Sequence, residues 1–187
     1  MEINVVPRTS NWQQASNLRQ IPVLVCTSSQ IFTGYAYSVH KQRLLDALNE
    51  GFTVNNAKLG VNFLPLSDVE VYLPDGTKGK MIFTYIRKSR ILFVAERTQS
   101  ESQIPLAQTY PYSAKKKSVD VKVSLPSYTL VGKMHNDLYS LLVDTLERND
   151  NFLPITNVEI SPPVACDESK FDFVAVRADQ VMYISEL

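Results

Sequence analysis

The feature that most constrains the fold of this chain is an internal repeat, because a duplicated sequence predicts the same structural unit twice. Shifting the sequence by 98 residues places Gly34 on Gly132 and the leucine-rich segment 44–48 on 142–146. These matches define a first repeat and a second repeat within one chain.

Two further blocks match in the same order. Residues 63–71 match 152–160 at a shift of 89, and residues 83–96 match 173–186 at a shift of 90. The fall in the shift from 98 to 89 places extra residues in the first repeat near 52–60, where glycines and asparagines predict a loop. Apolar positions keep their phase throughout, which indicates duplication of the whole unit.

Each repeat has the pattern of several short strands and one helix. Apolar and polar residues alternate over 119–125, as in a half-buried strand. The matched glycines Gly34 and Gly132 predict a bend or a close backbone contact in the second strand. Leucines at helical spacing predict a helix over 138–146, and residues 74–79 predict a hairpin turn between later strands.

We therefore expect a mainly β (α+β) chain of two tandem small β-barrel domains, each with about five strands and one short helix. A small barrel hides its sheet edges by closing on itself. The expected divisions are an N-terminal segment at 1–19, a first barrel at 20–98, a linker at 99–117 and a second barrel at 118–187.

The turn before the last strand carries a family resemblance. Residues 86–94 read Ile-Arg-Lys-Ser-Arg-Ile-Leu-Phe-Val, and residues 176–184 read Val-Arg-Ala-Asp-Gln-Val-Met-Tyr-Ile. Both resemble the second conserved segment of Sm-like proteins, an Ile-Arg-Gly turn followed by a strand. Lys88 and Ala178 replace the turn glycine, and a helix stands where that family reads RNA bases with a loop. The resemblance, to Sm-like or SH3-like barrels including bacterial Sm-like domains of unknown function, implies a small barrel more than RNA binding.

Charge is balanced over the whole chain but not between the repeats. Basic and acidic residues number 19 each, which argues against a polyanion-binding role for the chain as a whole. Residues 1–106 carry 11 basic and 8 acidic side chains, whereas residues 118–187 carry 5 basic and 11 acidic ones. Repeats of opposite sign can dock on each other or stack head to tail between chains.

The residues that could carry catalysis or bind a metal form no recognisable set. His40 and His135 lack cysteines or carboxylates at ligand spacing, and the chain has neither Gly-x-Ser-x-Gly nor a glycine-rich phosphate loop. Asp46 and Asp144 are matched, so a paired-carboxylate site is one interpretation. Their place beside core leucines on a short helix favours a solvated or capping role. We expect no catalytic residue, no cofactor and no metal.

Matched residues elsewhere have structural interpretations beside the functional ones. Arg87 and Arg177 either have a structural role, bonding to turn carbonyls or to Glu70 and Glu159, or contact a ligand.

Several apolar residues are expected to fill the core. They are Cys26, Leu48, Phe63, Leu146 and Phe152.

The basic residues of the first repeat and the linker form the candidate partner site. The second repeat folds without counterparts of Lys88 and Arg90, so folding alone does not require them, and we expect them to be exposed. The predicted partner-binding residues are Arg87, Lys88, Arg90, Lys115, Lys116 and Lys117.

The leading hypothesis is a non-enzymatic interaction or scaffold protein that acts through protein–protein association, including self-association. The alternative is a nucleic-acid (RNA)-binding protein that uses the basic turn and the linker. No small-molecule substrate is evident.

The sequence also predicts a location. Residues 1–8 lack the pattern of a secretory signal, and no apolar run approaches the ~18 residues of a membrane-spanning helix. Cys26 and Cys166 form no CxxC pair. We expect a cytoplasmic protein without a membrane span.

Overall fold

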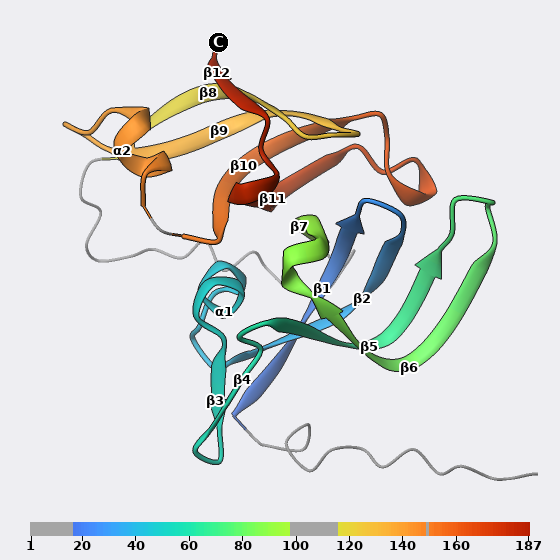
Figure 1. The fold of residues 1–187 in the computed structure, drawn as a ribbon. Helices are drawn as coiled ribbons and strands as arrows, with labels where there is room; N and C mark the ends of the chain where they lie inside the picture. The colour runs from blue at the N-terminus through green and yellow to red at the C-terminus, as the bar shows by residue number, and fades with distance from the viewer. Residues whose placement is uncertain (1–16, 98–115, 149) are drawn as a thin grey trace, which may run out of the picture.

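The computed structural model describes residues 17–97, 116–148 and 150–187, and shows a mainly β chain with two short α-helices (Figure 1). The first repeat contains β1 (Leu18–Thr27), β2 (Ile31–Val39), α1 (Leu44–Glu50), β3 (Phe52–Val54), β4 (Ala57–Leu59), β5 (Phe63–Tyr72), β6 (Lys78–Arg87), η2 (Lys88–Arg90) and β7 (Ile91–Glu96). The second contains β8 (Lys116–Ser124), β9 (Thr129–Asp137), α2 (Leu142–Leu146), β10 (Phe152–Ser161), η3 (Ala165–Asp167), β11 (Lys170–Arg177), η4 (Ala178–Gln180) and β12 (Tyr183–Glu186).

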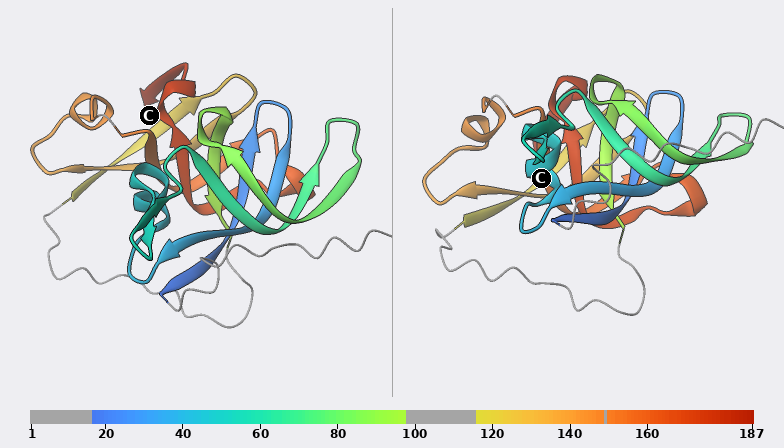
Figure 2. Two further views of the ribbon diagram at one scale, coloured as in Figure 1. Left: turned by 60° about the horizontal axis from the view of Figure 1, so that its bottom comes forward. Right: turned by 90° about the horizontal axis from the view of Figure 1, so that it is seen from below.

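Ten of the strands form one antiparallel sheet in the order β12-β8-β9-β10-β11-β7-β1-β2-β5-β6. The expectation of two separate small barrels is therefore wrong. Neither half closes on itself, because β11 of the second repeat pairs with β7 of the first and makes the sheet continuous. In Figure 2, β5 and β6 curve away from this junction. We call the β11–β7 pairing the internal junction.

The duplication is confirmed in the strand order and in the register of the strands. Each repeat contributes five strands in the same relative order. Phe63 lies opposite Arg87 in the β5–β6 pair, and Phe152 lies opposite Arg177 in the β10–β11 pair. The two halves therefore repeat the same pairing residue for residue, although they do not form independent barrels.

The matched glycines occupy the same close contact in each half. A Cβ atom on Gly34 would lie 2.7 Å from the carbonyl oxygen of Ser67 on β5. A Cβ atom on Gly132 would lie 2.9 Å from the carbonyl oxygen of Thr156 on β10. The predicted close backbone contact is confirmed, because only glycine allows the second and third strands of each repeat to approach this closely.

The extra residues of the first repeat form a hairpin instead of the predicted loop. Phe52 and Val54 of β3 are buried, while the residue between them is exposed, so the segment has the alternation of a strand. Asn55 and Asn56 adopt positive φ angles of 48° and 63° in the two-residue turn to β4. The two asparagines that suggested a loop form the turn of a β-hairpin.

The two helices differ in length and in contacts. The helix predicted over 138–146 begins only at Leu142, and Leu138 and Leu141 are exposed, so their predicted place in a helix is wrong. Leu48 of α1 is completely buried, as predicted, whereas its counterpart Leu146 is only partly buried.

The hydrophobic cores of the two repeats interlock at the internal junction. Phe152 and Ala175 of the second repeat belong to the core cluster of the first. Cys26 and Phe93 of the first repeat belong to the cluster of the second, and Cys26 is buried as a free thiol, as predicted. Each repeat thus covers apolar residues of the other, which fixes the orientation of the two halves.

Candidate functional site

The predicted basic turn is only partly a surface. Arg87 and Arg90 are exposed at the end of β6 and in η2, and the Arg87 guanidinium lies 5.3 Å from the centre of the Phe63 ring. Lys88 between them is buried, with 3% of its surface exposed, so the expectation that it faces solvent is wrong. Glu70, one of the alternative partners considered for Arg87, instead forms an ion pair with a lysine of β6.

Lys88 is buried because its ammonium group holds the end of α1. Its Nζ donates hydrogen bonds to the carbonyl oxygens of Ala47, at 3.2 Å, and of Leu48. The Ala47 carbonyl also accepts the N–H of Gly51, whereas the last carbonyls of a helix otherwise lack partners within it, and a cation there interacts favourably with the helix dipole. Burial, with repulsion from Arg177, lowers the pKa of Lys88 to about 8. We conclude that Lys88 is a structural residue.

The remaining predicted lysines lie elsewhere in the molecule or outside the described residues. Lys115 lies outside the described residues, and Lys116 begins β8. Lys117 is exposed on β8, the strand next to β12, whereas Arg87 ends β6 at the opposite end of the sheet. The described part of the chain therefore does not bring the six predicted residues together in one patch.

Arg177 is held by its own turn. Its Nε and Nη2 donate to the two carboxylate oxygens of Asp179 at 2.9 and 3.0 Å, and its guanidinium lies 5.5 Å from the Phe152 ring centre. The partner within the turn is therefore the Asp179 carboxylate, and neither a turn carbonyl nor Glu159, the two alternatives considered for Arg177. This ion pair lowers the pKa of Asp179, and the matched arginine of the second repeat has a structural role.

The matched aspartates cap the two short helices. Asp46 accepts hydrogen bonds from the backbone and guanidinium of Arg43, which lowers the pKa of the Asp46 carboxyl. The Asp144 carboxylate accepts the backbone N–H of Leu141 at 2.7 Å. The interpretation as local caps is confirmed, since each carboxylate satisfies an N–H at the start of a helix.

His135 is hydrogen bonded at the surface, with its Nε2 2.8 Å from the hydroxyl oxygen of Thr156. Within the residues that the structure describes, no cluster of three histidines, cysteines or carboxylates could hold a metal ion.

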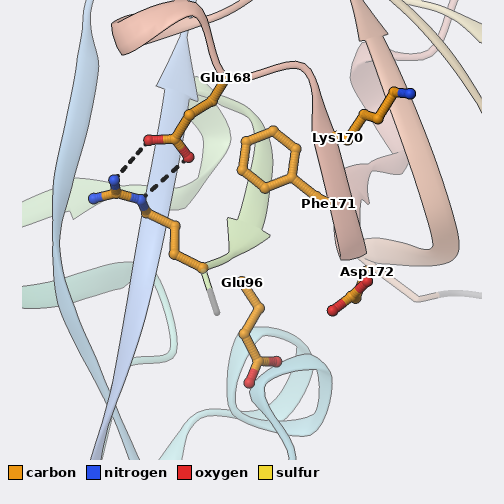
Figure 3. Close-up of a pocket in the computed structure, with 6 residues that line it drawn as sticks. Glu96, Glu168, Lys170, Phe171 and Asp172 are labelled. Atoms are coloured by element: carbon orange, nitrogen blue, oxygen red, sulfur yellow. Dashed lines mark hydrogen bonds and ion pairs between the residues drawn. The ribbon is translucent and has the colours of Figure 1, made fainter. Parts of the chain in front are cut away.

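A charged cavity of about 320 Å³ lies where the two repeats meet (Figure 3). Arg97, just after β7, forms an ion pair with Glu168, just before β11, at 2.6 Å between Nη2 and Oε1. Burial raises the pKa of Glu96, which also lines the cavity; Arg19 opposes this rise and Asp172 adds to it. The lining residues are Glu96, Arg97, Glu168, Lys170, Phe171 and Asp172. They supply no serine, cysteine or histidine nucleophile, and the ion pair binds one repeat to the other.

The clearest functional feature is a difference in exposure between matched strands. Phe93 of β7 is completely buried at the internal junction, whereas its counterpart Tyr183 of β12 is 51% exposed. Ala175 of β11 is likewise buried, whereas its counterpart Tyr85 of β6 is 54% exposed. Strands β6 and β12 are the two outer strands of the ten-stranded sheet. We call them the open edges.

The exposure extends to residues beside the open edges. Phe152 is completely buried under α1, but its counterpart Phe63 is 41% exposed, so the prediction that both fill the core is wrong for Phe63. Phe63 lines an apolar groove of about 510 Å³ with Val61, Pro65 and Tyr85. On the other edge, Met182 is 67% exposed. Large apolar side chains thus collect where each strand lacks a neighbour in the sheet.

These residues were missed because their sequence pattern matches that of their buried counterparts. A signal was present in the last strand of the second repeat. There, Met182, Ile184 and Ser185 replace the buried Leu92, Val94 and Ala95 of the first repeat, so that one apolar position becomes polar.

Comparison with protein-family models, with curated proteins and with solved structures finds no match. No helix in the described residues has the length and apolar character needed to span a bilayer.

Proposed function

We propose that this protein is a non-enzymatic interaction or scaffold protein that acts through protein–protein association at its two open edges. The observation that carries the proposal is the exposure of Phe63, Tyr85 and Tyr183 at positions whose repeat counterparts are buried against protein. An outer strand can accept another strand through main-chain hydrogen bonds, which give affinity, and the flanking apolar side chains then give specificity.

The charge distribution supports a protein partner over a nucleic acid. Lys88 of the basic turn is buried and bonds to the end of α1, so it is not available to a partner. The Arg87 guanidinium lies over an aromatic ring. The basic residues that remain on and after β6 are Lys78, Lys80, Arg87 and Arg90. They lie beside exposed apolar side chains, which is the composition of an interface with an acidic protein surface.

The test is affinity capture from extract of the native cell, with the wild-type chain and an edge-blocked chain as matched baits. The blocked chain carries Tyr85→Asp and Tyr183→Asp, which place charge on both open edges. Because both tyrosines are half exposed, thermal denaturation should be nearly unchanged.

We expect proteins recovered by the wild-type bait to be lost from the blocked bait. An identical set of captured proteins would contradict the proposal. A parallel titration with labelled single-stranded RNA and DNA, at low and at physiological salt, identifies the alternative function by micromolar binding with a steep salt dependence.

A further inference from the structure

We propose that the open edges bind each other between chains, so that β6 of one chain pairs antiparallel with β12 of a second copy of the same chain. The inference rests on the proposed function and names its partner. Its basis is the internal junction, in which the repeat counterparts of these two strands already pair within one chain.

The internal junction gives the register of the proposed contact. Strand β11 pairs with β7 through Val174 opposite Ala95, Ala175 opposite Val94 and Val176 opposite Phe93. The matched residues on the open edges lie 90 positions earlier or later.

Transferring the register places Thr84 opposite Ser185, Tyr85 opposite Ile184 and Ile86 opposite Tyr183 of the second chain. The transfer is justified because the repeats share their registers elsewhere. In the first repeat, Cys26 of β1 lies opposite Phe93 of β7.

The matched pair in the second repeat is Ser124 of β8 opposite Tyr183 of β12. Strand β12 therefore presents the same backbone positions to a new neighbour as β7 presents to β11.

The side chains brought together by this register are complementary. Continuing the pairing places Ile82, 67% exposed, opposite Leu187, which is also largely exposed. The corresponding positions of the internal junction are occupied by Asp172 and Arg97, which line the charged cavity. An apolar pair thus stands in the proposed contact where the internal junction has charged residues, and its burial would favour association.

The helices α1 and α2 occupy matched places at the internal junction and at the proposed contact. At the internal junction, Asn49 of α1 bonds to the backbone of Phe152. Its side-chain oxygen accepts the N–H of Phe152 at 2.8 Å, and its side-chain nitrogen donates to the carbonyl of Phe152 at 3.2 Å. In the proposed contact, α2 would cover Phe63 of the second chain in the same way. Glu147 stands in place of Asn49, so its carboxylate can accept the N–H but cannot donate to the carbonyl. The proposed contact is expected to be weaker than the internal junction.

Electrostatics favour pairing of unlike edges over pairing of like edges. The β6 edge carries Lys78, Lys80 and Arg87, whereas β12 carries Glu186 and belongs to the acidic repeat. Two β6 edges would bring like charges together, which is unfavourable. The proposed association is therefore head to tail and should weaken as salt is raised.

The first experiment mixes two variants that each lose one edge. Tyr85→Asp blocks β6 and leaves β12 intact, and Tyr183→Asp blocks β12 and leaves β6 intact. By sedimentation velocity at about 100 μM, where contacts of micromolar Kd are saturated, we expect the wild-type chain to form species larger than a dimer. Each variant alone should be a monomer, and their equimolar mixture should form a dimer.

The second experiment fixes the register with introduced cysteines on full-length chains that also carry Cys166→Ser. Thr84→Cys in one chain and Ser185→Cys in another should form an intermolecular disulfide, because opposite residues of antiparallel strands lie within disulfide distance. The matched control replaces Ser185→Cys by Glu186→Cys, whose side chain points to the other face of the strand. We expect at least tenfold more disulfide from the first pair. Cys26 remains in every variant, because it is buried and burial raises its thiol pKa to about 12.

A wild-type chain that is monomeric at this concentration, or a variant mixture that stays monomeric, would overturn the inference. Equal disulfide yields for Ser185→Cys and Glu186→Cys would also overturn it, because they would contradict the proposed register. If self-association fails while capture from extract still depends on Tyr85 and Tyr183, the edges bind a different protein and the proposed function stands. If capture is also unaffected, both proposals are wrong.

Discussion

Strands β7 and β12 occupy matched positions and pair with matched partners, yet one lies in the middle of the sheet and the other at its end. β7 is covered on its second side by β11 and is buried along its length except at its last residue. β12 has Tyr183 exposed and Ile184 only partly covered. The comparison shows that the position of a strand in the sheet, and not its sequence pattern alone, decides whether its apolar residues become core or surface.

The largest test of this comparison replaces the matched phenylalanines. Phe152→Ala removes a completely buried side chain at the internal junction and should lower the free energy of unfolding by about 3–5 kcal/mol. Phe63→Ala removes a half-exposed ring and should cost about 1 kcal/mol or less in the monomer. Urea denaturation measures both values, and equal losses would contradict the described difference in burial.

The second test compares the helices. Leu48→Ala should cost about 2–5 kcal/mol, because Leu48 is completely buried between α1 and the sheet. Leu146→Ala should cost less than half as much, because Leu146 only partly packs against the second core. Thermal and urea unfolding of the two variants give the two losses of unfolding free energy. A larger loss for Leu146→Ala would contradict the conclusion that α1 packs more tightly than α2.

The third test removes the ammonium group at the end of α1. Lys88→Ala should cost about 1–3 kcal/mol, because it leaves the Leu48 carbonyl oxygen without its buried donor, while the Ala47 oxygen keeps the N–H of Gly51. Arg90→Ala, two residues away and exposed, should change stability by less than about 0.5 kcal/mol. If both variants unfold at the same urea concentration as the wild type, the structural role assigned to Lys88 is wrong.

The smallest expected effect concerns the capping aspartates. The pKa of Asp46 is lowered below its ordinary 3.8 by Arg43, so the stabilisation it gives is complete above that value and is lost as the pH falls through the lowered pKa. Asp46→Asn should therefore reduce stability slightly at pH 7 and less at pH 2. Asp144→Asn is the control, because Leu141 stands where the first helix has Arg43. Unfolding curves at the two pH values measure the difference.

The sequence predicted the repeat unit better than the arrangement of the repeats. Alternation and matched glycines located the strands and the close contact at Gly34 and Gly132, because both depend on local geometry. The pairing of β11 with β7 joins residues about 80 positions apart. The alternation of apolar and polar residues in β7 and β11 does not show whether each repeat closes on itself or pairs with the other repeat.

The candidate site was harder to predict for a related reason. Lys88 looks like a surface lysine beside Arg87 and Arg90, and only the position of α1 shows that its ammonium group reaches helix carbonyls. Phe63 looks like a core residue because Phe152 is one. In both cases the side chain's role depends on an element distant in sequence, which composition and spacing do not reveal.

The internal junction has a consequence for the symmetry of any assembly built through the open edges. The two edges differ, so the contact joins unlike surfaces and is heterologous, and growth stops only when the last chain meets the first. A closed ring of n chains would contain twice n strand junctions of matched register, of which every second one lies within a single covalent chain. Rupture of one intermolecular contact would open such a ring without releasing a subunit, and the two ends would remain at high effective concentration for closing again.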